Sequence, residues 1–91
     1  MSLLTGTLRV ECTSELKEEI RKSGKAACVL VMDEIKNMGH VVDVWAPNDK
    51  EIDIIVEIDA RTIESVEKLT AEIRQLEGVS KIVQRISADI G

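Results

Sequence analysis

The sequence has almost no aromatic residues: Trp45 stands alone, and phenylalanine and tyrosine are absent. Nucleic-acid modules built on open sheets stack bases on exposed aromatic rings, so this shortage argues against such a module. Basic residues are also scarce, with 12 lysines and arginines against 17 acidic residues and a formal charge of −5. Binding to a phosphate backbone depends on clustered positive charge. We therefore expect no nucleic-acid partner.

Cysteines and long apolar runs are few as well. Cys12 and Cys28 are too few and too isolated for a disulfide framework. No apolar segment of about 20 residues predicts a membrane span, and no targeting segment is evident. The expectation is a cytoplasmic protein with free thiols, formed by a single domain over residues 1–91. Met1–Leu3 could be native or a cloning remnant.

Residues for catalysis or metal binding are equally sparse. His40 is the single histidine, and it follows Gly39 at an expected helix end, where an imidazole usually contacts carbonyl groups or solvent. A metal site from Cys12, Cys28 and His40 is conceivable, but these residues show neither C-x-x-C nor H-x-x-x-H spacing. Among the carboxylates, Glu18, Glu19, Glu51 and Asp53 lie in polar runs that are typical of solvated faces. We predict no enzyme activity, no cofactor and no metal.

Strands are indicated by apolar residues that alternate with polar ones or form short apolar runs. The predicted strands are Leu4–Cys12, Val41–Ala46, Glu51–Asp59 and Val79–Ile86. Pro47-Asn48-Asp49 supplies turn residues between the second and third strands, which predicts an antiparallel hairpin. Ser87–Gly91 is expected to be a frayed tail.

A first helical region is predicted over Ser14–Met38. Thr13 or Ser14 can serve as its N-cap, and Gly39 can take the left-handed conformation that ends a helix. Glycine costs about 1 kcal/mol in a helix interior, so we expect a break or kink at Ser23-Gly24. The apolar positions with helical spacing are Leu16, Ile20, Ala27, Leu30, Val31, Ile35 and Met38.

A second helix is expected to start from a cap at Asp59 or Thr62 and to end at Gly78. Its apolar stripe consists of Ile63, Val66, Leu69, Ile73 and Leu76. The order of elements is then β-α-β-β-α-β, the split arrangement of ferredoxin-like domains. We predict an α+β fold in which a four-stranded antiparallel sheet carries two helices on one face.

The other face of the predicted sheet is mostly charged. Strand alternation places on it Thr7, Arg9, Glu11, Asp43, Trp45, Asp53, Ile55, Glu57, Lys81, Val83 and Arg85. Trp45, Ile55 and Val83 interrupt the charges, and an apolar centre with a polar rim suits a subunit interface. The alternative is a solvated face with scattered apolar residues.

Two stretches resemble known sensing domains. "IDIIVEIDARTIESVEKLTAEIRQLEGVSKIVQRI" resembles the second half of the RAM domain of leucine-responsive and asparagine-type regulators and is similar to the related ACT domains. "AACVLVMDEIKNMGHVVDVW" is similar to an ACT first helix entering its second strand. The resemblance implies a homodimer or higher homo-oligomer that binds an amino acid or similar small polar metabolite between subunits.

The resemblance also implies candidate ligand-binding residues. Asp53 matches the aspartate that opens the third strand of the sensing domains, and Ser23, Gly24 and Lys25 form the nearest glycine-bearing turn. The leading hypothesis is therefore a stand-alone regulatory module that binds a metabolite and signals to a separate partner protein. NapD-type chaperones, which hold the signal peptides of exported redox enzymes, share the same layout. The alternative is a protein-interaction or chaperone-type module that binds a peptide along a sheet edge.

Overall fold

The computed structural model describes residues 3–46 and 53–89. Helices and strands alternate along the chain much as the sequence pattern predicts. The elements are β1 (Leu3–Cys12), α1 (Ser14–Ser23), the 3-10 helix η1 (Gly24–Cys28), α2 (Val29–Lys36), β2 (Val41–Trp45), β3 (Asp53–Ala60), α3 (Ile63–Arg74) and β4 (Val79–Asp89).

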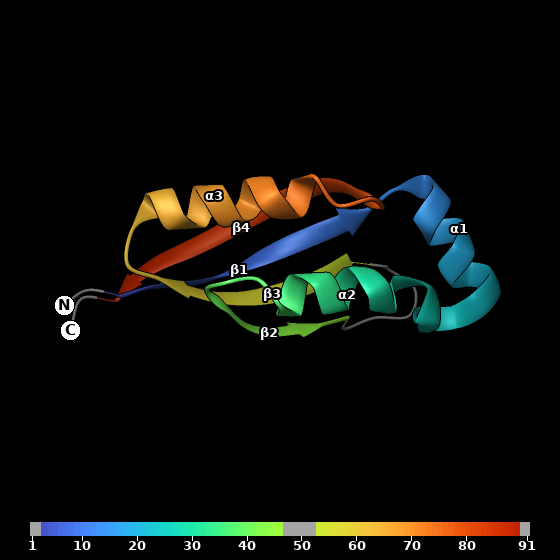
Figure 1. Ribbon diagram of the computed structural model, residues 1–91, viewed down its shortest axis with the longest axis horizontal. Helices are drawn as coiled ribbons and strands as arrows, with labels where there is room; N and C mark the ends of the chain where they lie inside the picture. The colour runs from blue at the N-terminus through green and yellow to red at the C-terminus, as the bar shows by residue number, and fades with distance from the viewer. Residues whose placement is uncertain (1–2, 47–52, 90–91) are drawn as a thin grey trace.

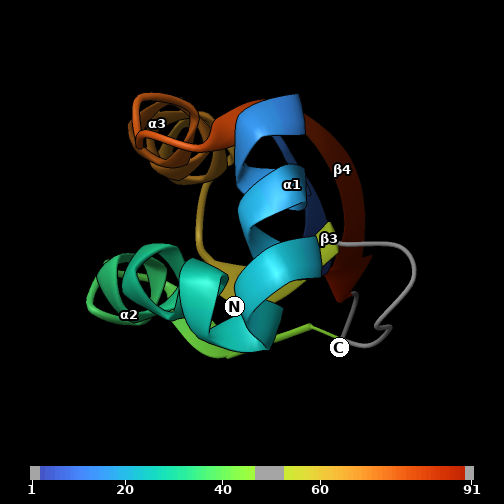
Figure 2. The same ribbon diagram turned by 90° about the vertical axis from the view of Figure 1, so that its right-hand side faces the viewer.

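The four strands form one sheet in the order β2-β3-β1-β4, and all neighbouring strands are antiparallel (Figure 1). β1 and β3 are central, so β2 and β4 are the two edges. α2 and α3 lie on one face of this sheet, as the view along its length shows (Figure 2). The predicted ferredoxin-like α+β fold is confirmed, with a third helix, α1, added to the two that cover the sheet.

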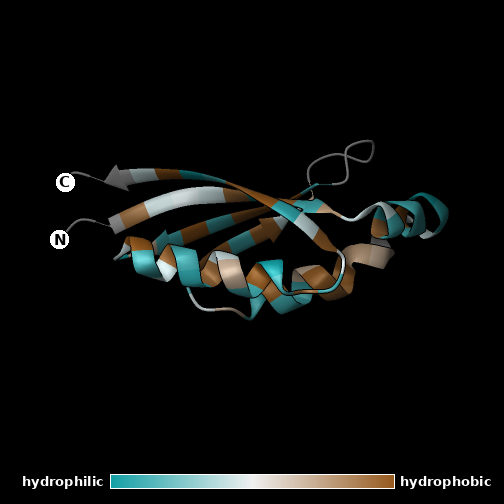
Figure 3. Ribbon diagram, turned by 90° about the horizontal axis from the view of Figure 1, so that it is seen from above, coloured by the Kyte–Doolittle hydropathy of each residue, from teal (hydrophilic) through white to brown (hydrophobic). Residues whose placement is uncertain are grey.

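The core lies between the sheet and α2 and α3. β3 carries the alternation that the sequence predicts, with every second side chain buried. Leu8, Val10, Ile54 and Val56 of the central strands are fully buried, as are Ile35 of α2 and Ile73 of α3. Burial of these aliphatic side chains is the main stabilising term, at roughly 25 cal/mol per Å² of apolar surface. Figure 3 shows both helices on one side of the sheet.

The predicted break at Ser23-Gly24 is confirmed. Gly24 has φ 77° and ψ −170°, a conformation that other residues rarely adopt, and it separates α1 from η1 and α2. As a result α1 leaves the layer of α2 and α3 and lies beyond one end of the sheet (Figures 1 and 2). The Thr13 hydroxyl caps α1 by accepting a hydrogen bond from the Leu16 N–H.

Two other helix ends differ from the predictions. α2 ends at Lys36, and the left-handed residue after it is His40 with φ 71°, not Gly39. The His40 carbonyl accepts a hydrogen bond from the Asp59 N–H at 2.9 Å, which ties this turn to β3. α3 ends at Arg74, before Gly78, while Thr62 is its N-cap, as one of the two predicted alternatives.

The predicted frayed tail is wrong for the part that is described. β4 continues to Asp89, because residues 87 to 89 pair with the first residues of β1, Leu3 facing Asp89 and Thr5 facing Ser87. β2 ends at Trp45, one residue before the prediction. The predicted turn Pro47-Asn48-Asp49 and the predicted first residues of the third strand, 51 and 52, lie outside the described residues.

Two residues of the predicted apolar stripes are exposed. Leu30 is 75% exposed and Ile63 is 52% exposed. The other stripe residues pack in or against the core, including Ile20, Val31, Val66 and Leu69. The break at Gly24 explains why Leu30 is exposed. α2 is not a continuation of α1, and the residues that it buries in the core are Val31 and Ile35. Within the described ranges, no helix combines the length and the apolar character that crossing a membrane would require.

Candidate functional site

The residues predicted to bind a metabolite lie in two different places. Ser23 and Gly24 are exposed at the corner where α1 meets η1, and the backbone of Lys25 continues into η1. Asp53 opens β3 on the uncovered face of the sheet, where its Oδ2 accepts a hydrogen bond from the Arg9 Nε–H at 2.8 Å. Neither Ser23, Gly24 nor Asp53 lines either of the two clefts described below.

The residues predicted to form an interface are brought together. Trp45 faces Ile55, Ile55 faces Arg9, and Arg9 faces Val83 in the strand registers. The four side chains therefore form one row across all four strands on the uncovered face of the sheet, which we call the central row. Val83 is 42% exposed, and Trp45 and Ile55 are half-buried.

A cleft of about 430 Å³ lies at the end of the molecule where α1 leaves the helix layer. We call it the end cleft. α1 forms one wall, α2 forms the other, and the turn between α3 and β4 closes it at Gly78. Its lining residues are Thr13, Glu15, Leu16, Glu19, Ala27, Leu30, Val31, Glu34, Glu77 and Gly78.

The local sequence explains the shape of the end cleft. The Thr13 N–H donates to the Gly78 carbonyl at 2.8 Å, which fixes the start of α1 to the turn before β4. Gly24 then redirects the chain, so that η1 turns the corner and α2 runs back along the sheet (Figure 1). Thus Leu16 and Leu30, from different helices, line the same space.

The charged side chains that line the end cleft are all acidic. Glu15, Glu19, Glu34 and Glu77 contribute four carboxylates, whereas no lysine, arginine or histidine is among the described residues that line it. Four aliphatic residues supply the rest of the side-chain surface apart from Thr13. Its volume lies within the range of about 300 to 1,000 Å³ that is usual for ligand sites. Such a lining favours a ligand that combines apolar groups with positive charge.

A smaller cleft of about 280 Å³ lies between α3 and the turn before β2. Its lining includes His40, Ser65, Lys68 and Glu72. The Ser65 Oγ is 2.9 Å from the Thr62 Oγ1, and the Ser65 N–H donates to that same oxygen, so Ser65 belongs to the N-terminal cap of α3. His40 has the positive φ that turns the chain into β2. These contacts give both residues structural roles.

Sequence reasoning missed the end cleft. It placed Leu16 and Leu30 on one apolar stripe and did not single out the glutamates at 15, 34 and 77. The available signal was the break at Gly24: once the helix is divided there, Val31 and Ile35 suffice to define the buried face of α2. Leu30 then lies outside the buried face, so burial in the core does not explain why this position is apolar.

Neither Cys12 nor Cys28 forms a disulfide, and both are buried in the core. Burial raises the pKa of the Cys12 thiol from 9.0 to about 11, with smaller contributions from the nearby Cys28 and Asp53. Cys12 is therefore a neutral, packed side chain at neutral pH, because the reactive form of a cysteine is the thiolate. Cys12 therefore acts as a small core residue.

We expect the protein to lose stability between about pH 9 and pH 11 through Cys12. Its folded-state pKa of about 11 exceeds the ordinary 9.0, so the stabilisation is complete below pH 9 and is lost as the pH rises through 11. At about 1.4 kcal/mol per unit, the loss is about 2 to 3 kcal/mol. Urea unfolding at several pH values would show it, and a Cys12→Ala variant should lack this component. Equal pH dependence in both proteins would contradict the assignment.

No family model matches the sequence, and no curated protein matches it. Solved structures do resemble it. Hypothetical protein PHS023 from Pyrococcus horikoshii superposes with a TM-score of 0.65 at 18% identity, over 92% of this chain and 88% of that one. The E. coli Tat proofreading chaperone NapD superposes with a TM-score of 0.65 at 16% identity, over 90% of this chain and 74% of NapD.

A third similar structure is that of MtbAldR, with a TM-score of 0.69 and 19% identity over 93% of this chain. This chain spans about half of MtbAldR, 52% of its length. At these identities the likenesses concern the fold alone. They agree with the sheet order and helix placement of the structure, so the chain has a ferredoxin-like α+β fold in common with all three proteins.

Proposed function

We propose that this protein is a small interaction module that holds a basic, partly apolar peptide segment of a partner protein in the end cleft. The observation that carries the proposal is the lining of that cleft, with four carboxylates around aliphatic side chains. Leu30, at 75% exposed, is the most exposed large apolar residue described there. The likeness in fold to the proofreading chaperone NapD is consistent with a role of this kind.

The charge of the end cleft favours one of the two functions expected from the sequence. An amino acid carries a carboxylate as well as an ammonium group, and its carboxylate would lie among the glutamates of the end cleft. The only side-chain donor among the described lining residues is the Thr13 hydroxyl. Arginine or lysine side chains of a peptide would instead be attracted by those glutamates. The geometry thus favours the interaction module, and the proposed role is binding without catalysis.

The test is a binding measurement with a labelled peptide that places two arginines beside two leucines. We expect fluorescence anisotropy to show saturable binding, which should weaken by about tenfold or more with Glu34→Lys, because one attraction becomes a repulsion. Leu30→Asp should weaken it similarly by removing exposed apolar contact. Both residues are exposed, so neither change should unfold the protein.

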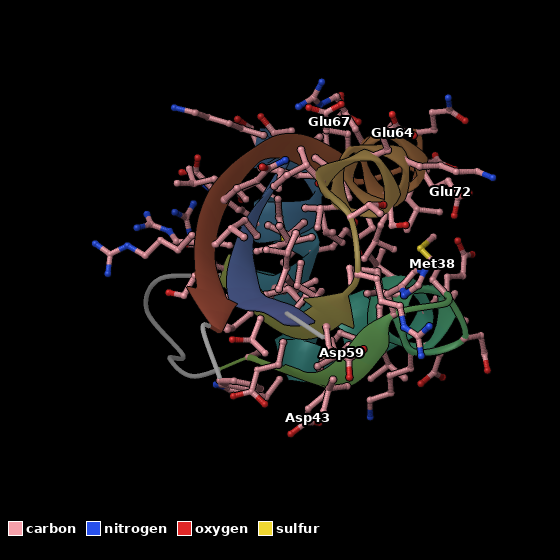
Figure 4. All side chains as sticks on the ribbon, turned by 90° about the vertical axis from the view of Figure 1, so that its left-hand side faces the viewer. Met38, Asp43, Asp59, Glu64, Glu67 and Glu72 are labelled. Carbon is pink, nitrogen blue, oxygen red and sulfur yellow. The ribbon has the colours of Figure 1, made fainter. Side chains whose placement is uncertain are left out.

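Glu67→Lys is the matched control for Glu34→Lys. Glu67 is exposed on α3, outside the end cleft, and carries the same charge (Figure 4). It should leave peptide binding nearly unchanged. A peptide with glutamates in place of the arginines should not bind. Equal binding of the two peptides, or an equal loss with the control variant, would refute the proposed site.

Metabolite sensing stays a prediction, and the same protein can be used to check it. An amino acid that binds the folded state raises its stability by about 2.7 kcal/mol at a hundredfold excess over Kd. A thermal-shift screen of the common amino acids would detect such a gain. A specific shift with one amino acid, in the absence of peptide binding, would favour the sensing module over the interaction module.

A further inference from the structure

We infer that the uncovered face of the sheet binds a second copy of this chain, in a face-to-face dimer whose two-fold axis runs parallel to the strands. This inference concerns a different surface from the end cleft and does not depend on the proposed peptide binding. It rests on the side chains that the strand registers place beside one another. The relevant ones lie in rows across the sheet, at right angles to the strands.

Among the rows that the registers define on this face, three adjacent ones contain Arg9 and its neighbours on either side. The central row contains Trp45, Ile55, Arg9 and Val83, in order from β2 to β4. A second row contains Asp43, Glu57, Thr7 and Arg85. A third row contains Asp53, Glu11 and Lys81 on β3, β1 and β4.

The charge on this face changes sign across the sheet. Lys81 and Arg85 lie on β4, at one edge, whereas Asp43 lies on β2, at the other, with Glu57 and Asp53 beside it on β3. Figure 4 shows Asp43 projecting from the edge of the sheet, well separated from the acidic residues of α3. The face is therefore basic along its β4 edge and acidic along its β2 and β3 half, and the central row crosses it with three apolar side chains and Arg9.

This gradient selects one of the two ways to stack the face on itself. A two-fold axis parallel to the strands places β4 of one copy over β2 of the other. Arg85 then meets Asp43 of the other copy, and Val83 meets Trp45 of the other copy. An axis perpendicular to the strands would instead place β4 over β4 and bring the basic residues of both copies together. Opposite charges across an interface favour the first arrangement.

The acidic residues of the third row oppose this arrangement less than two free carboxylates would, because Arg9 offsets one of their two negative charges within each copy. Its Nε–H donates to Asp53 Oδ2 at 2.8 Å, and its Nη2 lies 3.9 Å from Glu11 Oε1. In the stacked dimer, Glu11 of one copy lies near Asp53 of the other. The Arg9 side chains of both copies, which pair with these carboxylates, lie beside them. The guanidinium groups also present flat surfaces to Ile55 of the facing copy.

Edge-to-edge pairing of two copies through β4 is disfavoured by the same residues. If two β4 strands paired antiparallel around Val83, Lys81 of one strand would lie opposite Arg85 of the other. Like charges directly opposite each other destabilise a strand pair. Charged residues on an edge strand are a common means of preventing such contacts. The uncovered face is thus the surface of the sheet that suits a second copy.

The area of these three rows predicts a weak dimer. Four strands about 4.8 Å apart and three rows about 6.8 Å apart cover roughly 400 Å² per copy. A standard stable interface covers about 800 Å² per partner. We therefore expect a reversible equilibrium with a dissociation constant in the micromolar range, so the experiment must span that range.

The test measures self-association by analytical ultracentrifugation and by the fluorescence of Trp45, which is the only tryptophan in the chain and lies in the central row. Arg85→Glu and Asp43→Arg should each weaken the dimer by about tenfold or more. Each creates two repulsive contacts per dimer. An equimolar mixture of the two variants should recover an affinity near that of the wild type, because both contacts in the mixed dimer are again attractive.

Controls separate this result from effects on folding or net charge. Arg74→Glu on the exposed surface of α3 changes the net charge as Arg85→Glu does and should leave association unchanged. Asp43 Oδ1 also accepts the Val44 N–H, so Asp43→Asn, which keeps an oxygen there, should weaken association while the protein stays folded. A monomer at all concentrations up to about 1 mM, far above the expected range, would overturn the inference. A mixture no tighter than either variant alone would also overturn it.

Discussion

Replacing Gly6 by alanine is expected to lower the free energy of unfolding by about 3 to 4 kcal/mol. Gly6 lies in β1, between Ile58 of β3 and Ile86 of β4. A Cβ atom at this position would be 2.2 Å from the Arg85 carbonyl oxygen and 2.9 Å from the Ile86 Cδ1. The first of these is a backbone atom, so no change of rotamer relieves the clash.

The cost arises because β1 and β4 must move apart. Their pairing extends over most of the length of both strands, and separating them near Gly6 lengthens hydrogen bonds on either side. Each buried backbone group left without a partner costs about 1 to 3 kcal/mol. Urea unfolding followed by circular dichroism would measure the loss. For a domain of this size, 1 kcal/mol corresponds to a shift in Tm of roughly 4 to 8 °C.

Gly39→Ala is the matched control for Gly6→Ala. Gly39 lies in the turn between α2 and β2, and a Cβ atom built there has no neighbour within 4 Å. Its stability should change by no more than about 0.5 kcal/mol. Equal effects of the two substitutions would show that the close approach of β4 to Gly6 is not what requires glycine.

Much of the fold follows from patterns that can be recognised in short stretches of the sequence. The alternation in Ile54, Val56 and Ile58 determines which face of β3 is buried, because side chains of a strand point to opposite faces in turn. Thr13 and Thr62 act as N-caps through hydrogen bonds to N–H groups three residues later. The chain changes direction at Gly24 and Gly78, which both have the positive φ that glycine adopts readily. Each of these effects depends on neighbours in sequence.

Other features depend on distant partners and could not be predicted. Ser87 and Asp89 continue β4 only because the start of β1 is available to pair with them, and nothing in the apolar pattern indicates it. The close approach at Gly6 likewise involves a residue almost 80 positions away, Arg85. Pairing of this kind is set by the register of the whole sheet. Local propensity carries no information on it.

The candidate sites were predictable to different degrees. Alternation placed Trp45, Ile55 and Val83 on one face, which the structure confirms, but only the register shows that they share a row with Arg9. The register itself is hard to predict from the sequence. In the short strand β2 it shifts at Val42, where the pairing with β3 is irregular. The end cleft depends on the direction that α1 takes after β1. The glycine predicts a break but not a direction.

Gly78→Val is expected to lower the free energy of unfolding by about 3 kcal/mol. Gly78 has φ 94°, where a β-branched residue is strongly disfavoured. A Cβ atom would also lie 2.8 Å from the Leu16 Cδ2. The Gly78 carbonyl accepts the Thr13 N–H at 2.8 Å, so strain at this residue is transmitted directly to the start of α1.

Backbone strain and the clash with Leu16 can be separated by a double-mutant cycle. Leu16→Ala removes the side chain that a valine at position 78 would meet, but it leaves φ at that position unchanged. The double variant should therefore be more stable than the sum of the single effects predicts, by about 1 kcal/mol. Full additivity would mean that φ alone accounts for the cost of Gly78→Val.

The same substitution distinguishes a cleft held in place by Gly78 from one that forms independently of it. Gly78 and Leu16 both line the end cleft, so displacing α1 should weaken binding of the arginine-containing peptide, even at temperatures where the variant is fully folded. Self-association through the sheet face should be unaffected, because none of the three rows contains either residue. Loss of peptide binding with retained dimerisation would show that the two surfaces act independently. If Gly78→Val binds the peptide as tightly as the wild type, the contact between Gly78 and α1 does not shape the cleft.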